Sequence, residues 1–481
     1  MHALAKMRCH QMAKVTGTQL SPEHLTVLEY AWNYYRERRV GPLYTNIGRN
    51  AGVSRDVVDA IFPNGLTSVF TWVGIPIQTT DKGCKPMALI EVDNPREVYL
   101  DNNATTPIRP EVTDALIGFF SDPRSFGNPS SSYGIGGLAY DVLHRARRRI
   151  AKTLKVEPGE LYFTGSGTEA NNLAIKGIAS KHKGGHIIST NVEHPSVLDT
   201  LRVLEAQGYE VSFLPVASDG TITADDVAAA IKDNTILVSI MAANNEIGTI
   251  FPVAEIGAVC RDRGIPFHVD GIQAFGKIRL WPKEMNIDML TLSGHKIYAP
   301  KGVGTLYLNP EVELIPQIDG GGQEKGLRSG TENVAGILAM GLAAKLARTE
   351  MDEQNAKFDY LRQRFLARLE ETVPDAIVNG TMEHRLPHNL SIGFPGVDSG
   401  SLLLSFDQIG VYVSAGSACS AGDDKVSHVL EAIGVDSGQY GTIRFSFGRD
   451  TSKEDIDYLF THLPTILDQL RELDVEMRAS A

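Results

Sequence analysis

The chain has 481 residues, a net charge of −12 at pH 7 and an apolar fraction of 42%. This length fits two or three globular domains, and the acidic balance argues against nucleic acid as the main partner. No apolar run reaches the roughly 18 residues of a membrane span, so no membrane segment is expected. The four cysteines are scattered without metal-ligand or disulfide spacing, which favours a reducing cytoplasm as the location.

Residues 1–88 differ in charge from the rest of the chain. They hold ten Lys/Arg and six Asp/Glu, a net charge of +4, so the remaining residues carry −16. Residues 1–18 lack the apolar core of a secretory signal and are expected to be disordered. A small, mostly helical domain is expected over residues 19–88.

Three helices are expected in this small domain. Ser21 followed by Pro22 is typical of a helix start, and apolar residues then recur at helical spacing as far as Tyr35. A second helix is expected near Thr45–Ala51, and a third begins at Ser54.

From Tyr99 onward, strand-like apolar runs alternate with helical patterns. Helices between strands imply βαβ units and a mainly parallel sheet. After about Glu350, a long charged helix precedes mixed strands and helices, which is typical of a smaller α+β domain. The expected strands are Glu160–Phe163, His186–Thr190, Val211–Pro215, Leu237–Met241, Pro266–Val269, Met289–Leu292 and Gly304–Leu308.

Two short polar motifs directly follow apolar runs that read as buried strands. One is Ser293-Gly294-His295-Lys296, and the other is His268-Val269-Asp270, which ends 26 residues earlier. A lysine can form a Schiff base with the aldehyde of pyridoxal phosphate (PLP). An aspartate can keep the pyridine nitrogen protonated, so that the ring withdraws electrons. Lys296 alone could be a surface lysine, but the buried strand before it favours a PLP site.

Other polar residues also follow expected strands. The segment 165–169 leads from a strand into a helix, and its glycines and free amide hydrogens suit a cofactor phosphate. An ordinary tight turn would have the same pattern. His194 could stack on the pyridine ring or merely cap a helix. The amides of Asn245 and Gln273 could bond the ring hydroxyl.

Residues 99 to about 475 resemble the NifS/IscS-like cysteine desulfurases of the class V aminotransferase family. Ten segments occur in the order found in that family, which makes the resemblance specific. It implies an α/β chain with PLP-dependent transferase fold type I, in which a large domain with a mainly parallel sheet joins a small α+β domain. The matching segments are 99–107, 127–131, 164–172, 193–194, 244–248, 268–273, 293–296, 328–333, 416–419 and 443–449.

The resemblance also implies domain boundaries. The desulfurase part spans residues 98–481. Its large PLP domain covers about 112–350, and its small domain combines about 98–111 with 351–481.

The resemblance assigns roles to individual residues. Lys296 binds PLP covalently, Asp270 pairs with the pyridine nitrogen, and His194 stacks over the ring and assists proton transfer. Arg444 binds the substrate carboxylate, since its planar guanidinium suits a two-pronged ion pair, although an exposed strand arginine is the alternative. Thr331 reaches the phosphate of a neighbouring subunit, which implies a homodimer. The other cofactor contacts are Asn245 and Gln273 at the ring oxygen, and Gly167, Thr168, Ser293 and His295 at the phosphate.

Cys419 determines the expected reaction. It lies in a run of small residues, 414–422, which suits a thiol on a mobile loop rather than a core cysteine. A free thiol titrates near ~8.5, so the site has to supply a base or lower the pKa, and His194 is a candidate base. By resemblance, L-cysteine is converted to L-alanine, and its sulfur becomes a persulfide on Cys419.

The small front domain resembles the DsrC/TusE-like sulfur-relay family. The matches are Leu-Ser-Pro-Glu-His (20–24), Ile-Phe-Pro-Asn-Gly (61–65) and Gly-Ile-Pro (74–76), followed by Cys84. That family carries sulfur on a cysteine of its C-terminal arm, so Cys84 is a candidate sulfur acceptor. The arm here is not the chain terminus, and the upstream arm cysteine of some relatives is replaced by Gly74.

Other functions compete with this interpretation. Selenocysteine lyase and other class V PLP enzymes share much of the site, although an aminotransferase does not need Cys419. Residues 45–62 also resemble a helix-turn-helix, which suggests a PLP-sensing DNA-binding regulator. The expected partners are L-cysteine, a second copy of the chain, and an acceptor such as an iron–sulfur scaffold or a thiolation-pathway protein. No metal ion is expected.

Overall fold

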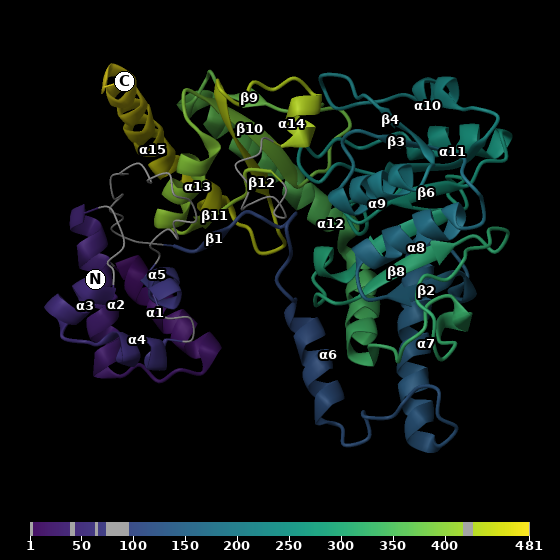
Figure 1. The fold of residues 1–481 in the computed structure, drawn as a ribbon, viewed down its shortest axis with the longest axis horizontal. Helices are drawn as coiled ribbons and strands as arrows, with labels where there is room; N and C mark the ends of the chain where they lie inside the picture. Colours follow the sequence, from purple (N-terminus) through teal and green to yellow (C-terminus); the bar gives the residue numbers. More distant parts are fainter. Residues whose placement is uncertain (1–2, 39–43, 63–65, 74–95, 417–426, 481) are drawn as a thin grey trace.

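The computed structural model describes residues 3–38, 44–62, 66–73, 96–416 and 427–480. These residues form a helical lobe at the N-terminus, a large α/β part and a small α+β part (Figure 1). Each part has a hydrophobic core of its own.

The N-terminal lobe consists of five helices: α1 (Ala3–Thr16), α2 (Pro22–Arg38), α3 (Tyr44–Ala51), α4 (Arg55–Ile61) and α5 (Leu66–Val73). The helices predicted to start at Ser21-Pro22, near Thr45–Ala51 and at Ser54 are confirmed as α2, α3 and α4. The predicted tail from Gly74 to Met87, with Cys84, lies outside the described residues.

The prediction of disorder for residues 1–18 is wrong where α1 forms. Cys9 and Ala13 are buried on one face of α1, and the Cys9 thiol lies 3.2 Å from the carbonyl oxygen of Trp72 on α5. The apolar face of α1 is narrow, and α5, which covers it, was not predicted either. The helix therefore depends on tertiary packing rather than on a strong local signal.

The large part is built on a seven-stranded sheet with the order β2-β8-β7-β6-β5-β3-β4. Strand β8 runs antiparallel to both of its neighbours, and the other pairs are parallel. All seven predicted strands are present, so the prediction of a mainly parallel sheet is confirmed. The strands are β2 (Leu161–Thr164), β3 (His186–Thr190), β4 (Glu210–Leu214), β5 (Thr235–Met241), β6 (Phe267–Asp270), β7 (Met289–Ser293) and β8 (Gly304–Leu308).

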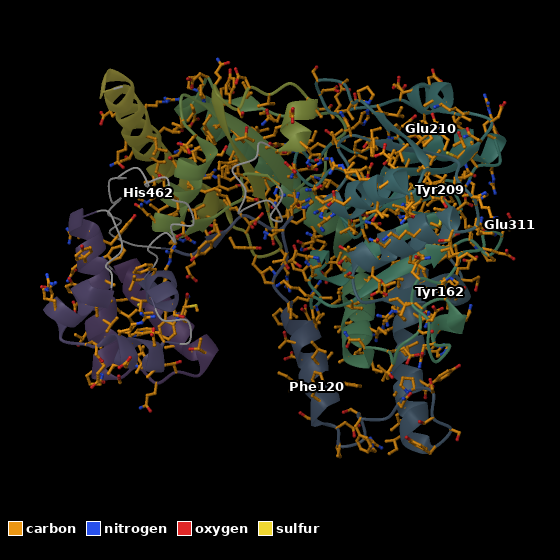
Figure 2. The ribbon with its side chains drawn as sticks, viewed as in Figure 1. Phe120, Tyr162, Tyr209, Glu210, Glu311 and His462 are labelled. Carbon is orange, nitrogen blue, oxygen red and sulfur yellow. The ribbon has the colours of Figure 1, made fainter. Side chains whose placement is uncertain are left out.

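Helices connect and cover these strands. Helix α7 (Gly134–Leu154) precedes the first strand of the sheet, and the connecting helices are α8 (Gly167–Ala179), α9 (Pro195–Ala206), α10 (Ala224–Ala230) and α11 (Val253–Asp262). Because β3, β5, β6 and β7 are parallel, their carboxyl ends meet at one edge of the sheet, where ligands bind in such folds. Helix α6 (Pro110–Ser121) projects away from the sheet and exposes Phe120 (Figure 2).

The small part combines two short sheets with three helices in the residues that the structure describes. Its sheets are β12-β10-β9 (Tyr440–Ser446, Asn389–Pro395 and Ile377–Val378) and β1-β11 (Val98–Tyr99 and Val411–Tyr412). Its helices are the C-terminal half of α12 (Val334–Thr372), α13 (Ser399–Gln408) and α15 (Lys453–Ser480). Helix α14 (His428–Ala432) comes from the same stretch of chain, but its Val429 and Leu430 belong to the large core.

Helix α12 begins earlier than predicted. It has 39 residues and starts at Val334, because Asn333 caps it and the apolar residues of its first half face the large core. Ile337 and Met340 belong to that core, whereas Phe358 and Phe365 belong to the small core. A single helix therefore runs through both cores.

The N-terminal lobe contacts the small part through α1. Arg8 donates to both carboxylate oxygens of Asp407 at 3.0 and 3.1 Å and also to its carbonyl oxygen. Gln11 donates to Glu97 at 2.7 Å. Among the described helices, none combines the length and apolar character needed to cross a bilayer.

Candidate active site

A cavity of about 310 Å³ lies at the carboxyl edge of the large sheet. Its wall combines the ends of β3, β5, β6 and β7 with the start of α8 and with Arg444 of β12. Ten residues predicted for the site line it: Gly167, Thr168, His194, Asn245, Asp270, Gln273, Ser293, His295, Lys296 and Arg444. The structure therefore brings together residues that are up to 277 positions apart in the chain.

Lys296 ends the short 3-10 helix that follows β7. Its Nζ atom donates to the carbonyl oxygens of Asn103 (2.5 Å) and Ala104 (2.8 Å), so these two carbonyls orient the amine. Behind it, buried Lys277 donates to the carbonyl oxygen of Lys296 at 2.8 Å. Burial and the nearby Lys296 lower the pKa of Lys277 to about 7. The backbone carbonyl of Lys296 is thus held by the side chain of a second lysine.

Asp270 ends β6 and is 5% exposed. One carboxylate oxygen accepts from the backbone N–H of Ile272 at 2.9 Å, and the other accepts from the side-chain amide of Asn171 at 2.8 Å. Each oxygen of a carboxylate has two acceptor sites, so the group keeps capacity for a donor from the cavity. A protonated pyridine nitrogen is such a donor.

The start of α8 forms another part of the wall. Ser166 caps this helix by accepting from Glu169 N at 3.1 Å, and Gly167 is its first residue. A Cβ atom at Gly167 would lie 2.3 Å from Ile272 Cδ1, so Ile272 would have to move to admit any larger residue here. The helix N-terminus suits an anion such as a phosphate. Ser293 also lines this cavity.

His295 lines the cavity next to Lys296, and its Nδ1 lies 3.1 Å from the hydroxyl of Thr105. Burial, together with the charges of Lys296 and Lys301, lowers the pKa of His295 to about 4. The imidazole is therefore neutral near pH 7 and can meet a phosphate only as a hydrogen-bond donor.

His194 forms the N-cap of α9. Its Nδ1 accepts from the backbone N–H of Ser196 at 3.1 Å and lies 2.8 Å from the hydroxyl of the same residue. Burial is the main cause that lowers the pKa of His194, and Lys296 acts in the same direction. His194 is therefore neutral near pH 7.

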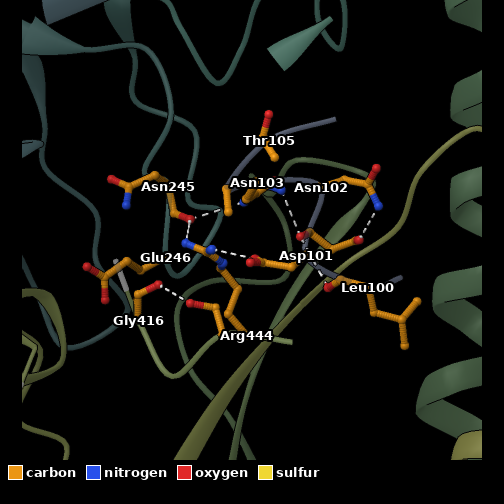
Figure 3. Close-up of polar contacts among 12 residues, drawn as sticks. Leu100, Asp101, Asn102, Asn103, Thr105, Asn245, Glu246, Gly416 and Arg444 are labelled. Atoms are coloured by element: carbon orange, nitrogen blue, oxygen red, sulfur yellow. Dashed lines mark hydrogen bonds and ion pairs between the residues drawn. The ribbon is translucent and has the colours of Figure 1, made fainter. Parts of the chain in front are cut away.

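Arg444 reaches the cavity from β12 of the small part (Figure 3). Its guanidinium donates to Asp101 Oδ1 at 2.7 Å and to the carbonyl oxygen of Asn245 at 2.9 Å. Arg444 is 2% exposed, so the alternative of an exposed strand arginine is wrong. Its Nε atom is buried without a hydrogen-bond partner in the described structure, which leaves a donor for a carboxylate.

Thr331 is a predicted site residue that does not line this cavity. It is exposed in the segment before α12. Cys419 and Cys84 lie outside the described residues. Gly416 and Ser427 are the described residues on either side of the segment that contains Cys419. Both lie close to Glu246, whose carboxylate accepts from the Ser427 hydroxyl at 2.5 Å.

Known proteins share this architecture. The sequence profile of the family "Aminotransferase class-V" matches residues 98–459. The chain belongs to this family. The match begins just after the N-terminal lobe, so the family assignment concerns the large and small parts.

Curated relatives place the chain more closely within the family. A cysteine desulfurase IscS of Clostridium botulinum is 45% identical over 383 residues, which cover 79% of this chain and 96% of the relative. An IscS of Methanosarcina thermophila is 44% identical over 381 residues, with coverages of 79% and 94%. The predicted kinship with NifS/IscS-like cysteine desulfurases is confirmed.

Solved structures agree with this placement. A NifS-like protein matches with a TM-score of 0.72 and 36% identity, covering 78% of this chain and all of that structure. A NifS-like protein from Rickettsia africae matches with a TM-score of 0.71 and 31% identity, covering the same share of this chain. The predicted PLP transferase fold type I is thereby confirmed.

Sequence reasoning missed several polar residues that line the cavity or support it from behind. Asn103, Asn171, Ser196, Glu193 and Lys277 are all buried and were given no role. Asn171 offered a signal, because it stands on a helix face that is otherwise apolar, in line with Ala174 and Ile175. A buried amide on such a face needs hydrogen-bond partners, and these partners are site residues.

Glu193 lies directly before His194 and is completely buried. Its Oε1 atom accepts from the hydroxyl of Thr190 and from the backbone N–H of Met241, both at 2.9 Å. Burial raises the pKa of Glu193 to about 8, and the negative charge of Asp270 adds to this effect. Glu193 is therefore mostly protonated at neutral pH.

Glu193→Gln is expected to change how stability depends on pH. From about pH 5 to pH 8 the unfolded chain has lost this proton while the folded protein keeps it, so the free energy of unfolding of the wild type falls as pH rises. The slope is roughly 1.4 kcal/mol per pH unit for one proton. The variant lacks this contribution, so its Tm should fall less across this range. Equal slopes for both proteins in thermal melts would contradict the assignment.

Proposed function

We propose that the protein is a PLP-dependent cysteine desulfurase that converts L-cysteine to L-alanine and transfers the sulfur to Cys419. The observation that carries the proposal is the arrangement of the cavity, in which the Lys296 amine, the Asp270 carboxylate and a helix N-terminus line one space. A related solved structure is described as SspA in complex with cysteine and is 36% identical, with a TM-score of 0.64 and coverages of 73% of this chain and 98% of that structure.

The residues present fit PLP. The carboxylate of Asp270 has acceptor capacity for the pyridine nitrogen, and Gly167 leaves room for a phosphate at the start of α8. Lys296 would hold the aldehyde carbon, and bound PLP supplies an electron sink for the substrate's α-carbon. The ring oxygen would meet Asn245 and Gln273, and the phosphate would meet Gly167, Thr168, Ser293 and His295.

The protein's own groups would orient the substrate and move protons. The guanidinium of Arg444 would hold the substrate carboxylate, because Arg444 lines the cavity and its Nε–H has no partner among the described residues. The amine of Lys296 would take the α-proton once the substrate has displaced it. His194 would stack over the cofactor ring and assist proton transfer.

The sulfur step balances without an external oxidant. The Cys419 thiolate attacks the substrate sulfur, so an S–S bond forms while the C–S bond breaks. The carbon retains the bonding electron pair and takes up a proton, which yields the methyl group of alanine. Cysteine and the Cys419 thiol thus give alanine and a Cys419 persulfide.

Product analysis tests this function. With L-cysteine and dithiothreitol, purified PLP-loaded protein is expected to release alanine and sulfide in equal amounts. If a keto acid forms instead, and only when an amino-group acceptor is added, the protein is an aminotransferase and the proposal is contradicted. Turnover of selenocysteine with no turnover of cysteine would identify a selenocysteine lyase.

Asp270→Asn is expected to lower kcat about a hundredfold or more, which corresponds to about 2.7 kcal/mol of lost transition-state stabilisation. The amide has no charge to keep the pyridine nitrogen protonated, so the ring withdraws electrons less strongly. Steady-state kinetics at saturating PLP measure the effect. Asp288→Asn is the matched control. Asp288 accepts from the backbone N–H of Phe267 at 3.0 Å and does not line the cavity. A similar loss in both variants would contradict the role of Asp270.

We further propose that Cys84 receives sulfur from Cys419, as the resemblance of residues 19–88 to sulfur-relay proteins suggests. A tether can raise the effective concentration of the acceptor to roughly millimolar if it spans the gap. From either cysteine, sulfur would pass to an iron–sulfur scaffold or a thiolation-pathway protein. Peptide mass spectrometry after addition of L-cysteine should find persulfide on both residues. Persulfide restricted to Cys419 would contradict the relay.

The protein is also proposed to act as a homodimer. Exposed Thr331 would reach the partner's cofactor phosphate, and the α6–α7 region exposes large apolar side chains that include Phe120 (69% exposed) and Phe126 (77% exposed). Such a surface is typical of an interface. Light scattering during gel filtration is expected to give twice the monomer mass, and a monomer would contradict this proposal.

A further inference from the structure

Asn171 connects two residues of the site. It is completely buried on α8, and its side-chain nitrogen donates to Asp270 Oδ2 at 2.8 Å and to Ser196 Oγ at 2.9 Å. An amide nitrogen carries two hydrogens, so both are used in these two bonds. One side chain therefore links the end of β6 to the start of α9.

The bond from Asn171 determines what Ser196 does. Because Ser196 Oγ accepts from the amide, its own hydrogen is available for His194 Nδ1, which lies 2.8 Å away. The backbone N–H of Ser196 points to the same nitrogen at 3.1 Å. Nδ1 thus accepts and carries no hydrogen, so a neutral His194 carries its hydrogen on Nε2.

Charged groups from four elements surround His194. Asp270 on β6 and Asp199 on α9 favour its protonation, whereas Lys296 after β7 and His428 on α14 oppose it. Burial outweighs these charges and lowers the pKa of His194. Two donors point at Nδ1, so this atom carries no hydrogen, and the neutral ring has its hydrogen on Nε2.

We propose that Asn171 is a positioning residue that acts on both sides of the cofactor site. It holds the carboxylate of Asp270 in place, and through Ser196 it makes His194 present its Nε2–H group to the cavity. The catalytic consequence rests on the proposed function, whereas the hydrogen-bond chain concerns only residues of this protein. An experiment can therefore contradict the hydrogen-bond chain without contradicting the proposed desulfurase function, and the reverse also holds.

Asn171→Asp tests the chain of hydrogen bonds directly. The introduced carboxyl is fully buried beside Asp270, so the two groups share one proton. Its other oxygen accepts the hydroxyl hydrogen of Ser196, so His194 loses a donor at Nδ1 and its pKa rises. The readout is modification of His194 by diethyl pyrocarbonate, followed by peptide mass spectrometry on the full-length protein without added PLP. The pH midpoint of the His194 modification is expected to rise by about one unit or more relative to the wild type.

Asn171→Ala is the second variant, since it removes both donated bonds without adding a charge. In the PLP-loaded enzyme it is expected to lower kcat for L-cysteine about tenfold or more, with a smaller change in KM. Thr200→Val is the matched control. Thr200 is also buried on α9 and donates to the carbonyl oxygen of Ser196 at 2.8 Å, but it touches neither His194 nor Asp270. In Thr200→Val, the pH midpoint of His194 modification and the kcat for L-cysteine should match those of the wild type.

Two results would overturn the inference. One is an unchanged midpoint in folded Asn171→Asp, as judged by circular dichroism. The other is a kcat for Asn171→Ala within about twofold of the wild type. A raised midpoint in a protein whose wild type does not turn over L-cysteine would support the hydrogen-bond chain and contradict the proposed function instead.

Discussion

Lys296→Ala is expected to abolish turnover of L-cysteine and to remove the covalently held cofactor. Lys296 would supply both the amine that binds the PLP aldehyde and the base for the α-proton, so one substitution removes two functions. The carbonyls of Asn103 and Ala104 that orient its amine cannot replace it. Reduction with borohydride followed by peptide mass spectrometry should find PLP on Lys296 of the wild type and on no residue of the variant.

Lys301→Ala is the control for this experiment, because Lys301 lines the same cavity. It tests whether any lysine near the cavity becomes labelled. The Lys301 variant should keep the label on Lys296. Label on another lysine of Lys296→Ala, combined with residual turnover, would contradict the assignment of Lys296.

Cys419→Ala is expected to lower alanine formation from L-cysteine by about a hundredfold or more while PLP remains bound. Without the thiol, no group accepts the substrate sulfur, so the C–S bond is not cleaved. The measurements are alanine release and the persulfide content of tryptic peptides after incubation with L-cysteine. The cofactor's visible absorbance shows that the variant is still loaded.

Cys260→Ala serves as the matched control for Cys419. Cys260 is 1% exposed on α11, and burial raises the pKa of its thiol to about 12, so it is not a nucleophile at neutral pH. This variant should form the Cys419 persulfide as the wild type does. Undiminished alanine formation by Cys419→Ala would exclude Cys419 as the sulfur acceptor.

The large domain could be predicted well because its signals are local. Each strand of the sheet is a short apolar run between polar turns, and all seven were found within two residues of their observed ends. The N-terminal lobe was harder to predict. Helices α1 and α5 pack on one another, so the order of α1 depends on a partner about 60 residues away rather than on its own pattern.

The site was predictable to a similar degree. Residues after parallel strands gather at one edge of the sheet, so Asp270 and Lys296 were found from their positions alone. Asn171, which lies behind the cavity wall, and Ser196, which lines the cavity, were missed because they act on other side chains of the site. Their role lies in mutual hydrogen bonds, and only the three-dimensional structure shows which donor faces which acceptor.

Helix α12 has a mechanical consequence. At 1.5 Å per residue, its 39 residues form a shaft about 58 Å long, anchored at one end in the large core and at the other in the small core. Any rotation of Arg444 and its strand away from Lys296 has to bend this shaft or pull one end out of its packing. The large and small parts should therefore melt in one cooperative calorimetric transition, because the shaft transmits strain from one part to the other.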